Sequence, residues 1–350
     1  MSNNVAVSFE QFLNKFSEKD WFNAIEKHLS HIHEVDRNAV QIWFRFYPLE
    51  LFRYLETVED KAKAIHQFAM QGEYELKNQV DSSHNFLYGH RFWSHTKTAL
   101  ESYAASFNNE PADLGKIIEE IAQKVSESAK ADKALTLGIT AIGLMTLVQA
   151  GFEAFKAAKG TSEKPSGIMT KSPEQIVAER AKDDSQGIFG FLKTVDKKYT
   201  AHWINAKSSG KYPIKSDADI ATASALDNSQ NWKEQDERCW EGVVPVECRS
   251  AACGTCWIGV LGGQEKLTEV GRLERKQMKI FGYNQTEDAK PFMRLACQAK
   301  TSGNVSVVIP PWNGVFGKKI YNNIADVELE PVTTSAVKLR ETIATAAKED

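Results

Sequence analysis

Four of the five cysteines of this 350-residue chain fall within one stretch of 50 residues. Cys248, Cys253 and Cys256 follow one another with four and then two residues between them, and Cys297 stands after 40 more. The thiolate sulfur of cysteine is a soft ligand, which suits zinc and iron–sulfur clusters better than hard cations. Four thiols in this pattern therefore predict a metal centre built on sulfur.

The spacing C-x4-C-x2-C with one distant cysteine is typical of a [2Fe–2S] cluster, in which two tetrahedral irons take two terminal thiolates each. Thiols five and three positions apart require a loop that wraps closely around the cluster, so the residues between them should be small. Apart from Arg249, they are Ser250, Ala251, Ala252, Gly254 and Thr255. Gly254 can adopt a positive φ at little cost, and backbone N–H groups aimed at the sulfurs would stabilise an added electron.

Three other interpretations of the cysteines are open. A four-cysteine zinc site is less favoured because such sites usually consist of two short knuckles, whereas Cys297 stands alone. Two disulfides, or four unrelated buried thiols, are less favoured still, since nothing in the sequence indicates an oxidising compartment. Cys239 lies outside the pattern and is expected to be a small buried apolar residue.

The elements that must position these thiols begin only in the second half of the chain. Residues 1–160 are poor in Gly and Pro and show apolar residues at three- and four-residue spacing, which predicts a helical domain. Residues 161–196 are predicted to be a linker, because Gly160–Gly167 has turn composition, although Pro173–Lys182 could form a short helix. Residues 197–330 are predicted to be the cluster domain, and residues 331–350 a solvated tail.

Short strands and one or two helices are expected in the cluster domain. Strands are predicted at Tyr199–Asn205 and Lys211–Ile214, on either side of a turn, and again at Trp257–Leu261 and Asn304–Ile309. A helix is expected to start from a cap at Ser216-Asp217, and another covers Val270–Phe281.

With these residues in view, residues 197–318 resemble the [2Fe–2S] ferredoxin domains of the plant and adrenodoxin group. The cysteine string also resembles cluster loops of succinate dehydrogenase iron–sulfur subunits and molybdenum hydroxylases, but those proteins carry further cysteine sets and this chain has only Cys239 to spare. The resemblance implies a β-grasp fold, a mixed sheet with a helix across it and the cluster near one edge. It also implies that Cys248 and Cys253 bind one iron, and Cys256 and Cys297 the other. The fold class is therefore α+β: an all-α N-terminal domain followed by a β-grasp ferredoxin-like domain.

The resemblance implies one-electron transfer between redox proteins, a reductase and an acceptor. Residues 1–160 resemble no family, and our hypothesis is that this helical domain is a docking or anchoring module. An electron-transfer subunit of a multi-chain oxidoreductase and a redox sensor are the alternatives. We assign no catalytic residues, so a non-catalytic carrier is favoured over an enzyme. Ferredoxins of this group are typically acidic, whereas residues 196–330 hold 18 Lys and Arg against 17 Asp and Glu.

Charge and hydropathy indicate whether a nucleic acid or a membrane is a further partner. The net charge of −3 and the lack of a basic stripe give no reason to expect a nucleic acid partner. Residues 134–152 contain no charged residue and just reach the length of a membrane span. Their Thr, Gln and Gly content favours a helix buried between other helices. We expect a cytoplasmic protein, with membrane association through residues 134–152 open but not favoured.

Histidines gather in the helical half, which holds seven of the eight in the chain. A metal or haem site at His84, His90 and His95 is one hypothesis. Spacings of six and five do not put these three on one helix face, so core and surface roles are favoured. The seven are His28, His31, His33, His66, His84, His90 and His95.

The ligand assignment makes a first prediction. Replacing Cys253 by Ser should abolish or strongly destabilise the cluster, because one iron loses a thiolate. Cys239→Ser, the matched control, should keep about two irons and two acid-labile sulfides per chain. Iron and sulfide analysis of the purified variants checks this. Loss of the cluster in Cys239→Ser with retention in Cys297→Ser would contradict the ligand set.

Overall fold

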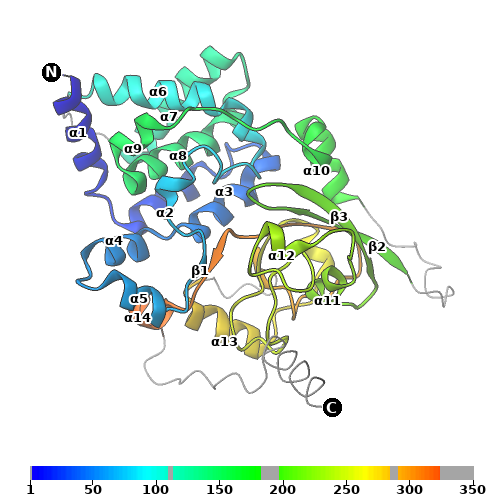
Figure 1. Cartoon of the computed structure of the whole chain (residues 1–350). Coiled ribbons are helices and arrows are strands. Elements are labelled where there is room, and N and C mark those ends of the chain that lie inside the picture. The colour runs from blue at the N-terminus through cyan, green and yellow to red at the C-terminus, as the bar shows by residue number, and fades with distance from the viewer. Residues whose placement is uncertain (1, 109–112, 183–196, 284–290, 324–350) are drawn as a thin grey trace. The chain divides into compact units, whose positions relative to one another are not determined.

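The computed structural model describes residues 2–108, 113–182, 197–283 and 291–323. The chain divides into two compact units (Figure 1). Unit 1 comprises residues 1–58, 75–179 and 205–208, and unit 2 comprises residues 59–74, 180–204 and 209–350. Helices make up the regular structure of unit 1 and a mixed sheet lies in unit 2, which confirms the predicted helical N-terminal region and C-terminal sheet domain.

Unit 1 is a set of helices arranged around α8 (Figure 1). Its longer helices are α1 (Ser2–Leu13), α2 (Glu18–His28), α3 (Glu34–Phe46), α4 (Leu49–Thr57), α6 (Trp93–Ala105), α7 (Leu114–Ala129), α8 (Lys133–Ala150), α9 (Phe152–Ala157) and α10 (Pro173–Ala181). Short 3-10 turns are η1 (Leu76–Asn78), η2 (Tyr88–Phe92) and η3 (Gly167–Thr170).

Helix α8 contains most of the uncharged run and lies in the core of unit 1. A Cβ at Gly138 would come within 2.5 Å of Val40, and one at Gly143 within 2.6 Å of Leu100, so these glycines allow neighbouring helices to approach closely. Among the described helices, α8 alone is long and apolar enough to cross a membrane, and 78% of it is buried inside the protein. A helix in a protein core can be as long and as apolar as a membrane span. The burial of α8 therefore supports the interpretation that it is a core helix.

Unit 2 contains a five-stranded sheet in the order β3-β2-β6-β4-β5. Strands β2 and β6 run parallel, and the other neighbouring pairs are antiparallel. The strands are β2 (Lys198–Ile204), β3 (Ser209–Lys215), β4 (Trp257–Gly262), β5 (Met293–Leu295) and β6 (Val305–Val308). The helices and turns beside them are α11 (Ile220–Ala225), α12 (Trp232–Gln235), η5 (Gln264–Lys266), α13 (Arg272–Phe281) and α14 (Gly317–Tyr321).

The predicted strands and the charged helix lie at the expected places within a few residues, but the first helix begins differently. Asp219, rather than Ser216-Asp217, caps α11 by accepting a hydrogen bond from the Thr222 N–H at 2.8 Å. Asp217 has a φ of +61° and belongs to the turn before the helix, so its backbone is not in an N-cap conformation. The predicted tail at residues 331–350 and the part of the predicted linker at residues 183–196 lie outside the described residues.

Residues 59–74, which fall inside the predicted helical domain, lie in unit 2. This segment, which we call the crossing segment, contains α5 (Lys61–Gln67) and β1 (Gln71–Gly72). Strand β1 pairs antiparallel with β7 (Trp312–Asn313), and the Val315 N–H donates to the Phe68 carbonyl at 2.7 Å. The cluster domain is thus completed by residues that come more than 170 positions before its cysteine string, since Gly72 and Cys248 are 176 positions apart.

A buried ion pair joins α13 to the edge strand β5. The Arg294 guanidinium donates to both carboxylate oxygens of Glu274, at 2.9 and 3.0 Å, and to the Thr268 carbonyl at 2.7 Å. Glu274 also accepts the Leu295 N–H at 2.9 Å, so the strand backbone is held as well. Both side chains are at most 2% exposed, so each charge is neutralised almost entirely by the other.

The ion pair provides a stability prediction. In Arg294→Met the Glu274 carboxylate loses its counter-charge inside the core, and the free energy of unfolding should fall by about 3–5 kcal/mol. Arg272→Met, which removes an exposed cation from the same helix, should change it by no more than about 0.5 kcal/mol. Urea unfolding followed by circular dichroism measures both. Equal stability of Arg294→Met and the unaltered chain would contradict the role given to the pair.

Candidate metal centre

The loop from Cys248 to Cys256 turns sharply at several residues. Arg249, Ala251 and Gly254 have φ values of +53°, +61° and +71°, so left-handed residues recur along the loop. Alternation of this kind turns successive N–H groups toward one side, which creates a concavity suited to negative charge. Only glycine adopts such angles without cost, so Gly254 alone suits its backbone angle by residue type, whereas Arg249 and Ala251 adopt theirs despite a Cβ.

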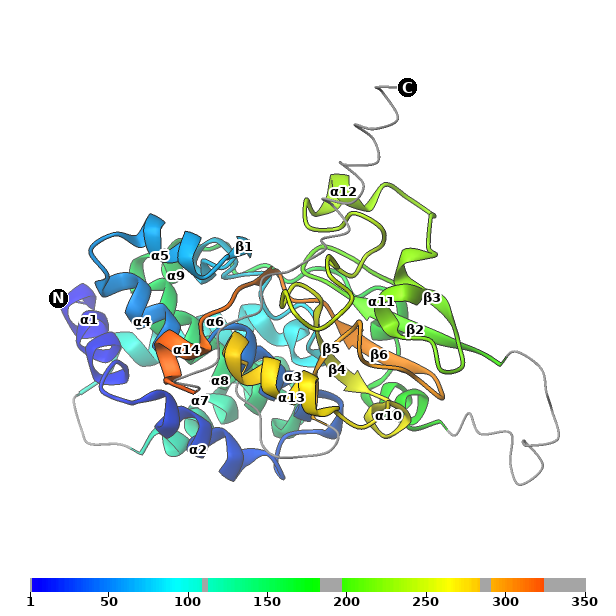
Figure 2. The ribbon, with the colours of Figure 1, turned by 90° about the horizontal axis from the view of Figure 1, so that it is seen from below.

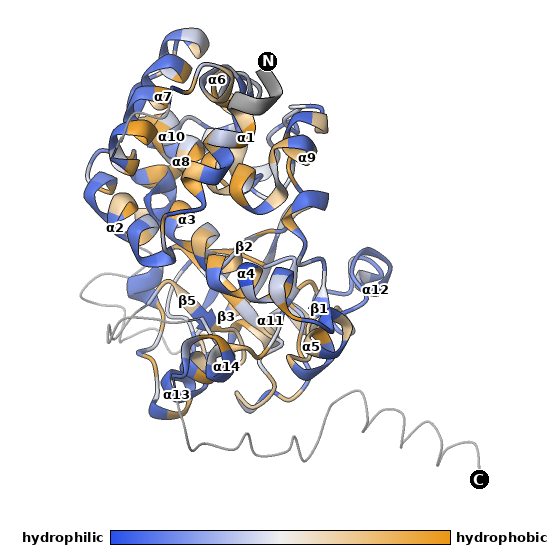
Figure 3. Cartoon of the chain, turned by 90° about the vertical axis from the view of Figure 1, so that its left-hand side faces the viewer, coloured by the Kyte–Doolittle hydropathy of each residue, from blue (hydrophilic) through white to orange (hydrophobic). Residues whose placement is uncertain are grey.

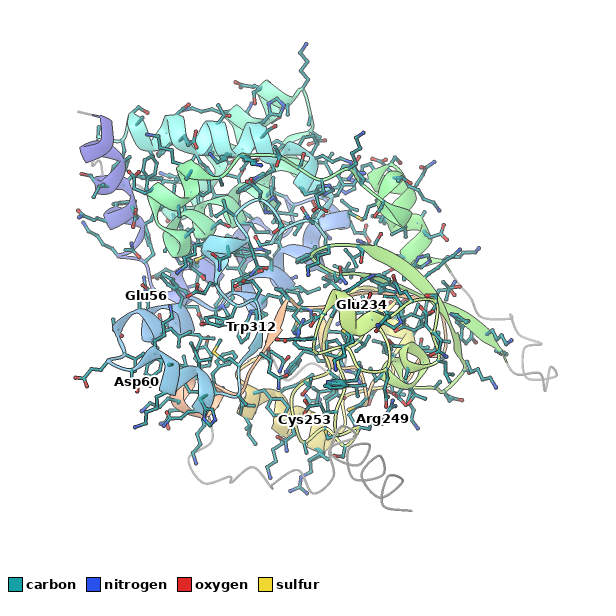
Figure 4. All side chains as sticks on the ribbon, in the orientation of Figure 1. Glu56, Asp60, Glu234, Arg249, Cys253 and Trp312 are labelled. Carbon is teal, nitrogen blue, oxygen red and sulfur yellow. The ribbon has the colours of Figure 1, made fainter. Side chains whose placement is uncertain are left out.

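The four predicted cysteines come together at this loop. Cys248 and Cys253 are in side-chain hydrogen-bonding contact, and so are Cys256 and Cys297. The two pairs are also close enough for Cys253 to interact electrostatically with Cys256, and Cys248 with Cys297. Figure 4 labels Cys253 and Arg249 on this loop.

Strand pairing brings the distant cysteine into place. Trp257 of β4 lies opposite Leu295 of β5, and the Ala296 N–H donates to the Cys256 carbonyl at 2.8 Å. Cys256 and Cys297 are therefore neighbours because each lies just beyond one end of the same short ladder. Arg294, which forms the ion pair with Glu274, directly precedes Leu295, so the ion pair fixes β5 next to Cys297.

Backbone N–H groups point at the sulfurs, as expected from the sequence. The Cys248 sulfur accepts from Ser250 at 3.4 Å and from Ala252 at 3.3 Å. The Cys297 sulfur accepts the Gln298 side-chain amide at 3.3 Å and a backbone hydrogen bond from Ala251. These donors stabilise negative charge on sulfur, which favours thiolates and an added electron alike.

Within each pair one thiol donates to the other, and the pKa values separate accordingly. The hydrogen bond from Cys253 lowers the pKa of Cys248 to about 4, and the same contact raises the pKa of Cys253. The hydrogen bond from Cys256 lowers the pKa of Cys297, while the pKa of Cys256 is raised. In each pair the contact thus favours the thiolate on one of the two sulfurs, which is the form that binds metal.

Arg249 anchors the loop to two other parts of unit 2. Its guanidinium donates to the Thr222 hydroxyl on α11 at 2.9 Å and forms an ion pair with Glu241. In the sequence, Arg249 is notable only as the one large residue between the thiols. Its partners are 27 and 8 positions away, and no local pattern connects them.

Gly254 is required by space as well as by backbone angle. A Cβ at this position would lie 3.0 Å from the ring of Phe281, the last residue of α13. Phe281 in turn packs edge-on against Trp257 at 5.7 Å between ring centroids. The loop therefore sits directly on an aromatic platform at the end of α13.

The donor set suits two irons better than one metal ion. Four thiols arranged as two contacting pairs match a cluster in which each iron takes two thiolates. Cys256 and Cys297 are buried, whereas Cys248 and Cys253 are partly exposed, so one end of the site faces solvent.

Comparison with known proteins agrees with this geometry. Residues 225–302 match the family described as 2Fe-2S iron-sulfur cluster binding domain. This segment of the chain is a [2Fe–2S] cluster-binding domain. The match contains all four predicted cysteines and confirms the cofactor predicted from their spacing. No curated protein and no solved structure matches the chain significantly.

Cys239 is separate from the four thiols of the cluster-binding domain. Its side chain is buried and donates to the Val243 carbonyl at 3.2 Å. Burial raises the pKa of Cys239 to about 12, so the thiol stays protonated at neutral pH.

The candidate histidines of unit 1 do not form a metal site in the part of the chain that the structure describes. His84 is fully buried against Trp93, with ring centroids 4.1 Å apart, and its burial lowers its pKa well below the usual value. His90 contacts the carbonyls of Leu87 and Glu163. The hydrogen-bonded core role favoured from the sequence fits His90, whereas neither ring nitrogen of the buried His84 has a hydrogen-bond partner among the described residues.

The crowding at Gly254 makes a testable prediction. In Gly254→Ala the new methyl group meets the Phe281 ring, and the left-handed backbone angle costs about 1–2 kcal/mol. The cluster-loaded loop should therefore be destabilised, and the visible absorbance should decay several-fold faster in the presence of an iron chelator. Gly271→Ala is the matched control, because its φ is −67° and no atom lies within 4 Å of the added Cβ. Equal decay rates for the two variants would contradict this account of the loop.

Proposed function

We propose that this protein carries single electrons through a [2Fe–2S] cluster held by Cys248, Cys253, Cys256 and Cys297. The observation that carries the proposal is the convergence of these four thiols, in two pairs, at a loop whose N–H groups point at sulfur. When bound, the cluster supplies a one-electron redox couple. The polypeptide supplies the thiolates, the backbone N–H dipoles that point at sulfur, and partial access to solvent.

The residues of the loop adapt the site to electron exchange. The N–H groups of Ser250 and Ala252 are fixed by the backbone before any electron arrives, so little rearrangement accompanies the charge change. Burial of Cys256 and Cys297 keeps water from one half of the site. The partly exposed Cys248 and Cys253 form the side through which an electron can pass to a docked partner.

A β-grasp assignment for unit 2 is supported by its mixed sheet and by α13 beside the β4–β5 edge, where the loop lies. The helical unit 1 is proposed as a docking or anchoring module for the redox partners, a reductase and an acceptor. Within unit 2, the crossing segment is held by the pairing of β1 with β7 and by a bond between the Gln71 side chain and Glu247, next to Cys248.

Spectroscopy of the full chain tests the proposal. The purified protein should contain about two irons and two acid-labile sulfides and show an EPR signal only after reduction with dithionite. Reoxidation by ferricyanide should consume one equivalent per chain, since each ferricyanide ion accepts one electron. This titration checks the one-electron capacity directly.

Two outcomes would contradict the proposal. A chain that binds one zinc ion and no sulfide would have no redox couple at this site. A cluster that neither takes an electron from dithionite nor returns it to ferricyanide would have a structural role only.

A further inference from the structure

Two helices of unit 2 carry a concentration of positive charge that the near-neutral composition of the domain conceals. Six cations lie on α13 and α14, and we call them the basic patch: Arg272, Arg275, Lys276, Lys279, Lys318 and Lys319. Arg272, Lys276, Lys318 and Lys319 are exposed, and the other two are half-buried. The only carboxylate on these two helices is Glu274, which is buried and neutralised by Arg294.

The basic patch borders the cluster loop. Phe281, at the end of α13, lies against Gly254, and the Phe316 N–H donates to the Phe281 carbonyl at 3.0 Å. Helix α14 starts at the next residue, Gly317, where a Cβ would lie 2.2 Å from the Lys279 carbonyl. The C-terminal end of α13 and the start of α14 therefore meet, and the ring of Phe281 separates them from Gly254, the residue after Cys253. Figures 2 and 3 show the two helices side by side.

An apolar residue lies within the basic patch. Leu273 is 51% exposed on α13, between Arg272 and the buried Glu274. An exposed leucine among cations offers both contact area and a charged surround, the composition of a protein interface with a polar rim. Charges of one sign near a reaction site also raise the encounter rate of oppositely charged partners by about 10- to 1000-fold at low salt.

We propose that the basic patch docks an acidic redox protein, which exchanges one electron with the cluster beside it. This inference rests on the proposed function and adds the chemical class of the partner. The net charge of residues 196–330 is close to zero, but a partner that approaches α13 and α14 meets local positive charge. Soluble ferredoxins of the group that this domain resembles are typically acidic. Here the docking surface of the ferredoxin-like domain is basic, and its partner is the acidic protein.

Small charged oxidants and an acidic protein test the local field. The full chain is reduced with dithionite, freed of excess reductant and mixed in stopped flow with ferricyanide, hexaammineruthenium(III) or oxidised acidic plant-type ferredoxin. In each reaction the chain loses one electron and the oxidant gains one. Raising the ionic strength from about 0.01 M to about 1 M shortens the screening length roughly tenfold. The rate with both anionic oxidants should fall about tenfold or more, and the rate with the cation should rise.

Two double variants with equal charge change provide the comparison. Arg272→Glu/Lys276→Glu reverses part of the basic patch and should remove or invert the salt dependence. Lys198→Glu/Lys211→Glu alters exposed lysines on β2 and β3, away from the β4–β5 edge of the sheet, and should retain it. A double variant that keeps its EPR signal still holds its cluster. A change in its electron-transfer rate is then due to the altered surface charge alone.

Each remaining outcome has a defined meaning. Salt-independent rates, or equal effects of the two double variants, would overturn the docking surface. Tight binding of duplex DNA at about 0.15 M salt that only Arg272→Glu/Lys276→Glu abolishes would assign the basic patch to nucleic acid and also overturn it. Absence of any EPR signal on reduction would instead reject the proposed function, which separates the two failures.

Discussion

The ladder between β4 and β5 is the constraint on which the metal centre depends. Three of the four proposed ligands lie on one short loop, and the fourth, Cys297, is 41 positions beyond Cys256. Pairing of Trp257 with Leu295 places these two cysteines at the same end of the ladder. Because β5 is only three residues long, its few backbone bonds need support, and the buried pair of Glu274 and Arg294 provides it.

Helix α13 combines three tasks in ten residues. Its buried face holds Glu274, its last residue supports the cluster loop through Phe281, and its outer face carries the cations of the basic patch. A change in the orientation of α13 would therefore affect the position of β5, the space beside Gly254 and the charge presented to a partner together. Stability, cofactor retention and recognition are linked through one element.

The sequence was most informative where a short spacing carried the chemistry. The cysteine spacing predicted the cofactor, and alternation or apolar runs predicted β2, β4, β6 and α13, because these signals are local. The crossing segment was missed because β1 has two residues and no periodicity, and its pairing with β7 spans more than 200 positions. The partners of Arg249 and Arg294 were missed for the same reason, since charged residues that meet only in the fold leave no spacing to recognise. The cap of α11 was misplaced by two positions, as Asp217 and Asp219 are equally suitable by type and only the backbone angle distinguishes them.

The proposed metal centre consists of four thiolates of this chain around two irons and two sulfides. Native mass spectrometry of the intact protein measures the composition of the bound group directly, without reliance on its spectrum or activity. We expect one bound species with the mass of two irons and two sulfides, which is lost in Cys297→Ser. A chain that carries a single metal ion, or an intact cluster in Cys297→Ser, would contradict the proposed centre.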